Sequence, residues 1–522
     1  MPRASVLLAP MLAVGLAQEG ITTPLPRLAP RASAPVYNFL SATFGDHMVL
    51  QAAPMSAMIF GHTVAGQQVT TTFNGTSYTT VADEDGVWRQ QLPPTAASLT
   101  PYELTFESSF EHNLTATLRD VVFGDVFICG GQSNMQYAVG GATNSSEELA
   151  KADNYGQIRQ FVVGTGTSSD IPLEDLQTVQ DPWHVSSKDS VAGDSAVCFF
   201  FGERLADARP GRPIGLIGNN WGGTRVEQWS TNTSLARCGD GGGGGNGDLY
   251  NAMIHPYTVG PMAVSGFTWY QGEANTESIE SARDYACTFP EMIREWRARF
   301  DAPSAYFGFV QLSTWCGVDA LPEMREAQMA ALEKLDNVGY ATNADHGNAC
   351  NIHPPSKQFC GRRLGDSARG LVYGDEILWK SPTFANHVET NVRASPPGGT
   401  ATVQATVTLN DVSPSGLTTD IYPANYLKEA ANVSACVALN EGKNETCSWA
   451  GIELRDSGWL NASVTATADG LVLEAEAPPG VALDDVQVIA TSYGWGMIPM
   501  LSAYDLGTGL PVLPWKENVT TR

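Results

Sequence analysis

The spacing of hydrophobic residues divides the chain into three stretches. In residues 37–120, short segments alternate apolar and polar positions, as in VTTTF (69–73) and SYTTV (77–81), which flank the pair Asn74-Gly75. Alternation with a period of two is typical of strands that bury one face, and Asn-Gly is a strong hairpin signal. No helical periodicity competes in this stretch, so we predict an all-β module over 37–120.

The middle stretch, residues 121–380, alternates apolar runs with helical segments. The predicted strands are VFIC (126–129), IRQFVV (158–163), PIGLIGNN (213–220), VSGFTWYQ (264–271), AYFGFVQL (305–312) and VGYATNAD (338–345). The predicted helices cover 196–208, 279–300, 322–335 and 357–371. Continuous apolar strands separated by helices predict a parallel sheet that is covered by helices on both faces.

Strand patterns return in residues 381–522, with ATVQATVTL (401–409), ASVTATA (462–468), LVLEAEA (471–477) and VQVIATSY (486–493). We therefore expect an α/β protein whose central domain is flanked by N-terminal and C-terminal β-sandwich-like modules.

The first 36 residues do not fit these modules. Residues 1–17 combine Arg3, an apolar core at 6–16 and small residues at Gly15 and Ala17, which is the pattern of a secretory signal peptide. Residues 18–36 are rich in Pro, Ala and Arg and are predicted to form a flexible leader. No later segment is long and apolar enough to predict a membrane span. Eight N-x-S/T sequons agree with secretion; they begin at Asn74, Asn113, Asn144, Asn232, Asn432, Asn444, Asn461 and Asn518.

The nine cysteines leave at least one thiol unpaired. Cys129 and Cys198 lie in apolar segments and are expected to be buried small hydrophobes. Cys436 and Cys447 are close in sequence between strand-like segments and are expected to form a bridge. The remaining cysteines have no pairing that the sequence fixes. No CxxC pair or HExxH motif occurs, so we expect no metal site.

The chain is strongly acidic, with 30 basic residues against 55 acidic ones and a formal net charge of −25. Such an excess repels nucleic acid and anionic membranes, and we expect neither as a partner.

Chemically useful residues follow several of the predicted parallel strands. Ser133 comes after Gly130-Gly131, Gly222-Gly223 follow the strand at 213–220, and Gln271 ends the next strand. Asp345 ends the last strand, and His353 comes soon after it. Ligands of such sheets bind beyond the carboxyl ends of the strands. The alternative for Ser133 is that it only caps the next helix.

Together these residues supply what acyl transfer needs. Ser133 would be the nucleophile, His353 its base, and the N–H groups of Ser133 and Gly223 with the Gln271 amide the donors to an oxyanion. The alternative for His353 is a hydrogen bond within its own loop. His255 is a second candidate base, but it precedes the Gln271 strand, which favours a packing role.

Several sequence blocks resemble the sialate O-acetylesterase family, a branch of the SGNH hydrolases. They are FGDHMVLQ (44–51), DGVWRQQLPP (85–94), GDVFICGGQSNM (124–135), GLIGNNWGGTRVEQW (215–229), LYNAMIHP (249–256), WYQGEAN (269–275), IHPPSK (352–357), RRLG (362–365) and GWGMIPMLSAYDLGTGLPVLPW (494–515). The resemblance covers about 40–515 and implies an SGNH-hydrolase-like parallel sheet.

The same resemblance implies a serine esterase that removes O-acetyl groups from sialic acids without a metal or cofactor. It matches Ser133 to the nucleophile, His353 to the base, and Gly223 and Gln271 to oxyanion positions. Candidates for substrate binding or for supporting the site are Gln132, Asn134, Arg225 and Glu273. For Arg225 a substrate carboxylate and a surface salt bridge are both open, and for Glu273 a supporting role is preferred to a solvated loop carboxylate.

The acid behind His353 is the open point of this comparison. Many SGNH enzymes place an aspartate two or three residues before the histidine, where this chain has Asn351 and Cys350. Asp345 is the nearest upstream carboxylate and would complete a triad if its loop folds back, which a Cys350–Cys360 bridge would assist. The alternative is a dyad in which a backbone carbonyl orients His353.

Two other functions remain open from the sequence. One is an acetyl-esterase acting on plant or algal polysaccharide such as acetylated xylan, because the catalytic residues recognise the acyl group. The other is a secreted carbohydrate-binding protein with an inactive hydrolase core. For an active enzyme we expect an extracellular or lysosomal location with N-glycosylation; the sequence does not fix the oligomeric state.

Overall fold

The computed structural model describes residues 37–109, 114–239, 244–348, 350–393, 400–419, 447–479, 481 and 486–519. The predicted signal peptide and leader, three of the sequons (Asn113, Asn432 and Asn444) and Cys436 lie outside these residues. Within them, no helix has both the length and the apolar character needed to cross a membrane.

The predicted parallel sheet is confirmed. Its strands run in the order β13-β12-β11-β7-β10-β8-β9 within an 11-stranded sheet, and only β9 pairs antiparallel along this path. The bounds are β7 (Thr115–Gly131), β8 (Ile158–Val163), β9 (Val179–Val185), β10 (Ile214–Asn220), β11 (Gly266–Tyr270), β12 (Tyr306–Gln311) and β13 (Val338–Thr342). All residues of β10, β11, β12 and β13 are buried, as expected of strands covered on both faces.

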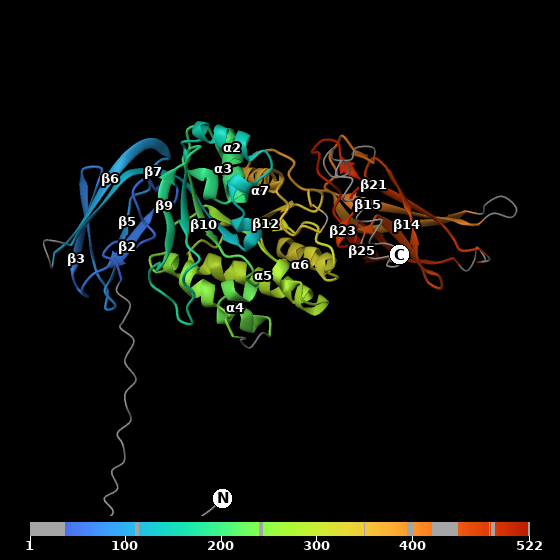
Figure 1. Cartoon of the computed structure of the whole chain (residues 1–522), viewed down its shortest axis with the longest axis horizontal. Helices are drawn as coiled ribbons and strands as arrows, with labels where there is room; N and C mark the ends of the chain where they lie inside the picture. The colour runs from blue at the N-terminus through green and yellow to red at the C-terminus, as the bar shows by residue number, and fades with distance from the viewer. Residues whose placement is uncertain are drawn as a thin grey trace, which may run out of the picture. The chain divides into compact units, whose positions relative to one another are not determined.

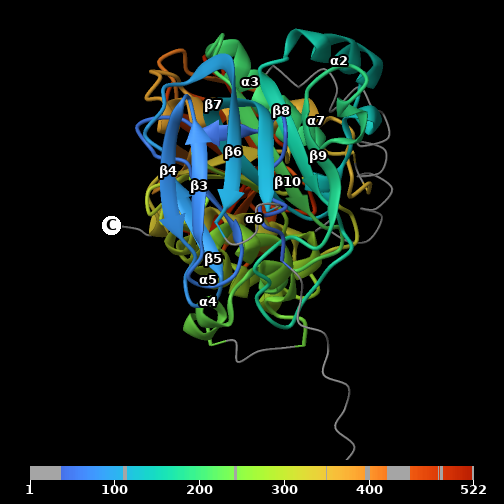
Figure 2. The same ribbon diagram turned by 90° about the vertical axis from the view of Figure 1, so that its left-hand side faces the viewer.

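The N-terminal β module shares a strand with this sheet. It contains β1 (Val49–Gln51), β2 (Met58–His62), β3 (Gln68–Phe73), β4 (Thr76–Val81), β5 (Val87–Gln91) and β6 (Ser98–Ser108). β3 and β4 form the hairpin predicted at Asn74-Gly75, and both turn residues have positive φ, at 50° and 75°. β6 pairs antiparallel with the first half of β7 (Figure 2). β7 is therefore one continuous strand that crosses the domain boundary expected at residue 120.

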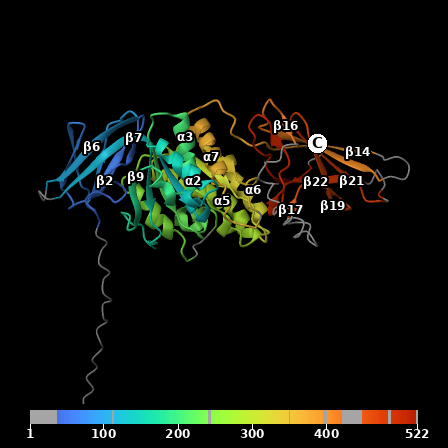
Figure 3. The same cartoon turned by 45° about the horizontal axis from the view of Figure 1, so that its top comes forward.

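Helices cover both faces of the parallel sheet (Figures 1 and 3). α3 (Ala196–Ala208) and α7 (Lys357–Val372) pack side by side on one face, where Phe201 meets Phe127 of β7 at 5.0 Å between ring centroids. α5 (Ile279–Arg299) and α6 (Leu321–Lys334) cover the other face, where Trp296 meets Phe267 of β11 at 5.6 Å. Shorter helices are α1 (Ser133–Gln136), α2 (Ser145–Lys151) and α4 (Asn232–Arg237).

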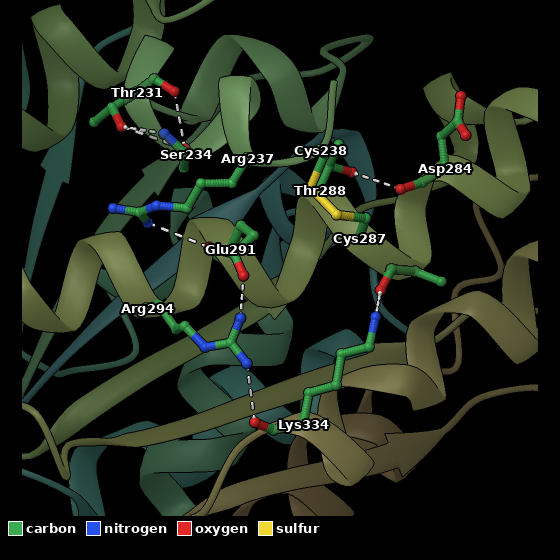
Figure 4. Close-up of a disulfide and its surroundings, with 11 residues drawn as sticks. Thr231, Ser234, Arg237, Cys238, Asp284, Cys287, Thr288, Glu291, Arg294 and Lys334 are labelled. Atoms are coloured by element: carbon green, nitrogen blue, oxygen red, sulfur yellow. Dashed lines mark hydrogen bonds and ion pairs between the residues drawn. A yellow bond between two sulfur atoms is a disulfide. The ribbon is translucent and has the colours of Figure 1, made fainter. Parts of the chain in front are cut away.

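Disulfides join elements on both faces of the sheet. Cys238, just after α4, is bonded to Cys287 of α5 (Figure 4), and next to this bond Arg237 pairs with Glu291. Cys129 of β7 is bonded to Cys198 of α3, so the prediction that both are unpaired small hydrophobes was wrong. A buried thiol and a buried disulfide give the same apolar sequence pattern, which is why the sequence did not separate them.

The third disulfide corrects another prediction. Cys350 is bonded to Cys316, in the loop between β12 and α6, and not to Cys360. Cys360 is a buried free thiol on α7. The expected Cys436–Cys447 bridge involves a residue outside the described part of the chain.

The C-terminal module is built mainly of antiparallel sheets around their own apolar core. One sheet has the order β14-β15-β21-β20 and another β19-β18-β22-β25. The bounds are β14 (Thr383–Arg393), β15 (Thr402–Asn410), β18 (Ala450–Leu454), β19 (Gly458–Asn461), β20 (Ser463–Ala466), β21 (Gly470–Glu476), β22 (Val488–Tyr493) and β25 (Trp515–Asn518). Short paired segments are β16 (Leu417–Thr418), β17 (Cys447–Ser448), β23 (Ile498–Pro499) and β24 (Tyr504–Asp505). The sequence did not predict β14 or β9, whose residues are mostly exposed or half-buried and carry no clear hydrophobic pattern.

Gly131, the last residue of β7, should be essential for the fold beneath Ser133. Its φ is +138°, and an added Cβ would lie 2.2 Å from the carbonyl oxygen of Tyr270. Gly131→Ala should lower the free energy of unfolding by about 2–4 kcal/mol, because strain and steric overlap add. Gly211→Ala is the control, since Gly211 has φ +81° with open space around it, and should cost about 1 kcal/mol. Equal losses in denaturant unfolding would contradict the close approach at Gly131.

Candidate active site

Ser133 lies directly beyond the carboxyl end of β7. The backbone N–H of Gln132 donates to the carbonyl of Tyr270 on β11 at 3.0 Å, which fixes the turn between β7 and α1. Gln132 occupies the N-cap position of α1 and makes no side-chain cap hydrogen bond. Ser133 is the first helical residue, so its hydroxyl does not cap the helix and is free for another partner.

That partner is His353. The His353 Nε2 atom lies 2.7 Å from Ser133 Oγ, although the two residues are 220 positions apart in the chain. Burial and the charge of Lys357 both lower the pKa of the His353 imidazole. The ring is therefore neutral at neutral pH, and Nε2 can accept the serine proton when Nδ1 carries the ring proton.

The Gly222-Gly223 turn also lies beside the nucleophile. A Cβ added to Gly222 would sit 3.2 Å from Ser133 Cβ, and the Gly222 N–H donates to Gln136 Oε1 at 3.0 Å. Gly223 is exposed, has φ +76°, and would meet nothing within 4 Å if a Cβ were added. Among the described residues, the backbone N–H groups of Ser133 and Gly223 have no hydrogen-bond partner. Both remain available as donors to a ligand.

Gln271 was predicted as a third oxyanion donor, and the structure gives it another role. Its side chain is fully buried, and its Nε2 donates to the carbonyl of Thr224 at 3.1 Å and to Asn275 Oδ1 at 2.8 Å. Its Oε1 accepts from the Tyr285 hydroxyl at 2.9 Å. Because an amide has only two protons, none is left for an oxyanion. Gln271 instead holds the loop that follows the Gly222-Gly223 turn.

Asp345 was predicted to orient His353, and the structure pairs it elsewhere. Its two carboxylate oxygens accept from the guanidinium of Arg363 on α7 at 2.7 and 2.8 Å. Burial alone would raise the pKa of Asp345, but the charges of Arg363 and His346 hold it below its ordinary value. No hydrogen bond joins Asp345 to His353 in the described part of the chain. The Asp345–Arg363 ion pair anchors the start of the base loop, whose described residues are 343–348 and 350–356, to α7.

The base loop is also held by contacts close to His353. Asn351, which stands where many SGNH enzymes have an aspartate, accepts the His353 backbone N–H on its side-chain oxygen at 3.0 Å. Cys350 carries the disulfide to Cys316. The sequence did not identify this pairing, because the two residues lie in loops whose approach only the fold determines.

The remaining predicted residues support the site from its surroundings. Gln132 Oε1 accepts from the backbone N–H of Ala274 at 3.2 Å, and Asn134 Nδ2 donates to Glu273 Oε1 at 2.5 Å. Glu273 is buried, and burial raises the pKa of its carboxyl group. The supporting role preferred for Glu273 therefore agrees with its position.

Arg225 lies just after the glycine turn and pairs with two carboxylates. Its guanidinium is 3.3 Å from Glu227 and 3.2 Å from Glu277, and its side chain is partly exposed. Of the two interpretations of Arg225, these contacts correspond to the surface salt bridge. His255, the second candidate base, is hydrogen-bonded to Thr258 and packs near Tyr250.

The arrangement is a hydroxyl nucleophile, a neutral imidazole in contact with it, and two unpaired backbone donors beside it. Within the described residues, no three or more His, Cys, Asp or Glu side chains are grouped so that they could hold a metal ion. The geometry suits attack by a serine oxygen on an acyl or phosphonyl centre.

A fluorophosphonate probe should label Ser133 in the native protein. His353→Ala should slow labelling by about 10²-fold or more, because the hydroxyl then has no base to take its proton. His255→Ala is the control and should be labelled at the native rate. Mass spectrometry of the labelled peptide measures both, and rapid labelling of the His353→Ala variant would contradict the Ser133–His353 pairing.

Comparisons with known proteins identify the family of this chain. A family model described as a sialic acid-specific acetylesterase of the carbohydrate esterases matches residues 123–368. The sialate O-acetylesterase of Homo sapiens is 34% identical over 411 residues, which cover 70% of this chain and 77% of that protein. The corresponding protein of Mus musculus is 31% identical, with 64% and 73% of the two chains covered. A solved carbohydrate acetylesterase from Xanthomonas citri superposes with a TM-score of 0.74 at 27% identity, covering 93% of this chain and 100% of that one. The chain belongs to the sialate O-acetylesterase family of carbohydrate esterases.

Proposed function

We propose that this protein is a serine esterase that removes O-acetyl groups from sialic acids through an acetyl-Ser133 intermediate. The observation that carries the proposal is the 2.7 Å contact between Ser133 Oγ and His353 Nε2. A serine hydroxyl hardly ionises at neutral pH, and a neutral imidazole at this distance is the group that can activate it.

In the first half of the reaction, His353 takes the Ser133 proton while Oγ attacks the acetyl carbonyl carbon. The carbonyl oxygen becomes an oxyanion, and the free backbone N–H groups of Ser133 and Gly223 are the donors that support its stabilisation. The imidazolium then gives its proton to the sugar oxygen, which leaves as a hydroxyl group.

In the second half, water attacks the acetyl-Ser133 ester. His353 takes a proton from the water, and the same two N–H groups face the second oxyanion. Collapse releases acetate, and the proton returns to Ser133 Oγ. Gln271 has no part in these steps except to hold the loop beside the glycine turn.

The base works without a carboxylate behind it, as a Ser–His dyad. Asp345 is neutralised by Arg363, and Asn351 contacts the main chain of His353. A dyad leaves the imidazolium less stabilised than a triad does, so its orientation depends on how firmly the base loop is held.

The substrate class rests on the relatives, which are named as sialate O-acetylesterases or as a carbohydrate acetylesterase. The three disulfides among the described residues support a location in an oxidising compartment, extracellular or lysosomal. The five sequon asparagines in the described residues are all exposed, which supports N-glycosylation; they are Asn74, Asn144, Asn232, Asn461 and Asn518.

Ser133→Ala should abolish release of acetate from O-acetyl sialic acid while leaving the melting temperature close to that of the native protein. The reason is that the hydroxyl forms the bond to the acetyl group and contributes little to packing. Acetate release from O-acetyl sialic acid and from acetylated xylan should be compared at equal acetyl concentration. Faster release from xylan would overturn the proposed substrate, and full activity of the Ser133→Ala variant would overturn the mechanism.

Asp345→Asn should lose stability but keep turnover near the native value, because the Cys316–Cys350 disulfide and the Asn134–Ile352 hydrogen bond still hold the base loop close to His353. Removing one partner of a buried ion pair leaves Arg363 uncompensated, which costs about 3–5 kcal/mol. Because the folded-state pKa of Asp345 is depressed, its contribution is present above the unfolded pKa and is lost as the pH falls through the folded value. The deficit of Asp345→Asn should therefore be full at neutral pH and shrink in acid. A large fall in kcat of Asp345→Asn with unchanged stability would instead favour a Ser133–His353–Asp345 triad.

A further inference from the structure

A buried lysine lies next to the proposed dyad and has no part in the reaction steps above. Lys357 is the first residue of α7 and has no exposed surface. Its ammonium donates to Asn134 Oδ1 and lies 4.9 Å and 5.3 Å from the ring centroids of Tyr137 and Tyr270. Burying an ammonium is costly unless it is hydrogen-bonded and compensated by charge. The position therefore calls for a functional explanation.

Asn134 connects this lysine to the base loop. Its Nδ2 donates to Glu273 Oε1 at 2.5 Å and to the carbonyl of Ile352 at 2.8 Å. Lys357 has only protons to offer, so the Asn134 oxygen must face it and the Asn134 NH₂ must face the two acceptors. The lysine thereby fixes which way the amide points.

The two ends of this connection are the immediate neighbours of the dyad. Asn134 follows Ser133 in α1, and Ile352 precedes His353 in the base loop. The Asn134–Ile352 hydrogen bond thus runs beside the Ser133–His353 contact and joins the same two segments. A shift of the base loop would have to break both.

We propose that Lys357 is a positioning residue of this site. Through Asn134, its buried ammonium holds the backbone before His353 against α1, the nucleophile helix, which carries Ser133. This contact would take the place of the carboxylate that orients the base in a triad. The inference rests on the proposed esterase function and adds a residue to which the sequence comparison assigned no role.

The charge of Lys357 gives the proposal a second, measurable consequence. Burial is the larger cause and the Lys357 charge the other in lowering the pKa of His353. Burial lowers the pKa of Lys357 itself to about 8, so it is charged at neutral and acid pH. The titratable groups facing Lys357 are Glu273 and the Cys360 thiol, with the Tyr270 and Tyr137 rings beside it. Removing the ammonium should let the His353 pKa rise, and activity should then be lost at a higher pH on acidification.

The test compares variants in the full-length protein with p-nitrophenyl acetate as substrate. Lys357→Met keeps the length of the side chain and removes the charge. It should lower kcat by about tenfold to a hundredfold with little change in KM, because the base loop loses its fixed position. It should also move the acid limb of the pH profile of kcat/KM, where activity falls as His353 is protonated, to higher pH.

Three further variants separate the parts of the proposal. Asn134→Ala breaks the connection but keeps the lysine, so it should lower kcat and leave the acid limb in place. The double variant Lys357→Met/Glu273→Gln buries neither charge. Its acid limb should move to higher pH by the same amount as that of Lys357→Met, and it replaces the single variant in the test if that one does not fold. Lys380→Met is the control, since Lys380 is exposed and its amine lies over the Trp379 ring, and both readouts should stay native.

An unmoved acid limb, or a native kcat, in folded Lys357 variants would overturn the proposal. Its failure can be told apart from failure of the esterase function, because the His353 imidazole can be titrated by NMR in the Ser133→Ala background without any turnover. A native His353 pKa in Ser133→Ala/Lys357→Met would reject the role of Lys357 and leave the proposed esterase function standing. Esterase activity that survives Ser133→Ala would reject the proposed function instead.

Discussion

The register of β7 with its two neighbours is the constraint on which the site depends. Gly131 pairs with Asn220 of β10 on one side and with Tyr270 of β11 on the other. All three strands are parallel, so their carboxyl ends meet at one level, and the residues that follow them are brought together. Ser133, the Gly222-Gly223 turn and Gln271 are neighbours for this reason. A one-residue slip of β7 would turn its buried side chains to the opposite face of the sheet.

The base loop needs separate anchors because it extends well beyond the end of β13. Its start is tied to α7 by the Asp345–Arg363 ion pair, and a disulfide joins Cys350 to the loop after β12. Its end is tied to the nucleophile helix through Asn134. These contacts hold the base loop at three points before His353. In a triad a carboxylate orients the imidazole directly; in the dyad that we propose, the main chain that carries His353 takes over this role.

The sequence predicted which segments meet beyond the strand ends, but it did not predict which hydrogen-bond partner each buried polar side chain finds. Most apolar runs and long helices of the central domain were predicted nearly to their ends, apart from β7, which begins at Thr115, and β9, which was not predicted. The strand order places Ser133 and the loop of His353 at the same edge of the sheet. Gln271 lies where the sequence placed it, but in this structure Thr224, Asn275 and Tyr285 take up its amide, and the sequence predicted none of these partners. Asp345 was assigned by proximity in sequence, whereas Arg363 comes from the next helix. Residue types alone do not say which of several partners a buried polar group will find.

The polar groups behind the dyad also explain why a buried lysine and a buried glutamate can be tolerated there. Neither is paired directly: Asn134 lies between them and satisfies one group of each. An Asn bridge keeps two opposite charges close enough to compensate, and its remaining proton is free to hold the Ile352 carbonyl. Two apolar residues of similar volume would avoid the desolvation cost, but they would leave the Asn134 oxygen without its donor and the amide without a fixed direction toward the Ile352 carbonyl. Burying these charges therefore lowers the stability of the fold, but it fixes the course of the main chain at Ile352, the residue before His353.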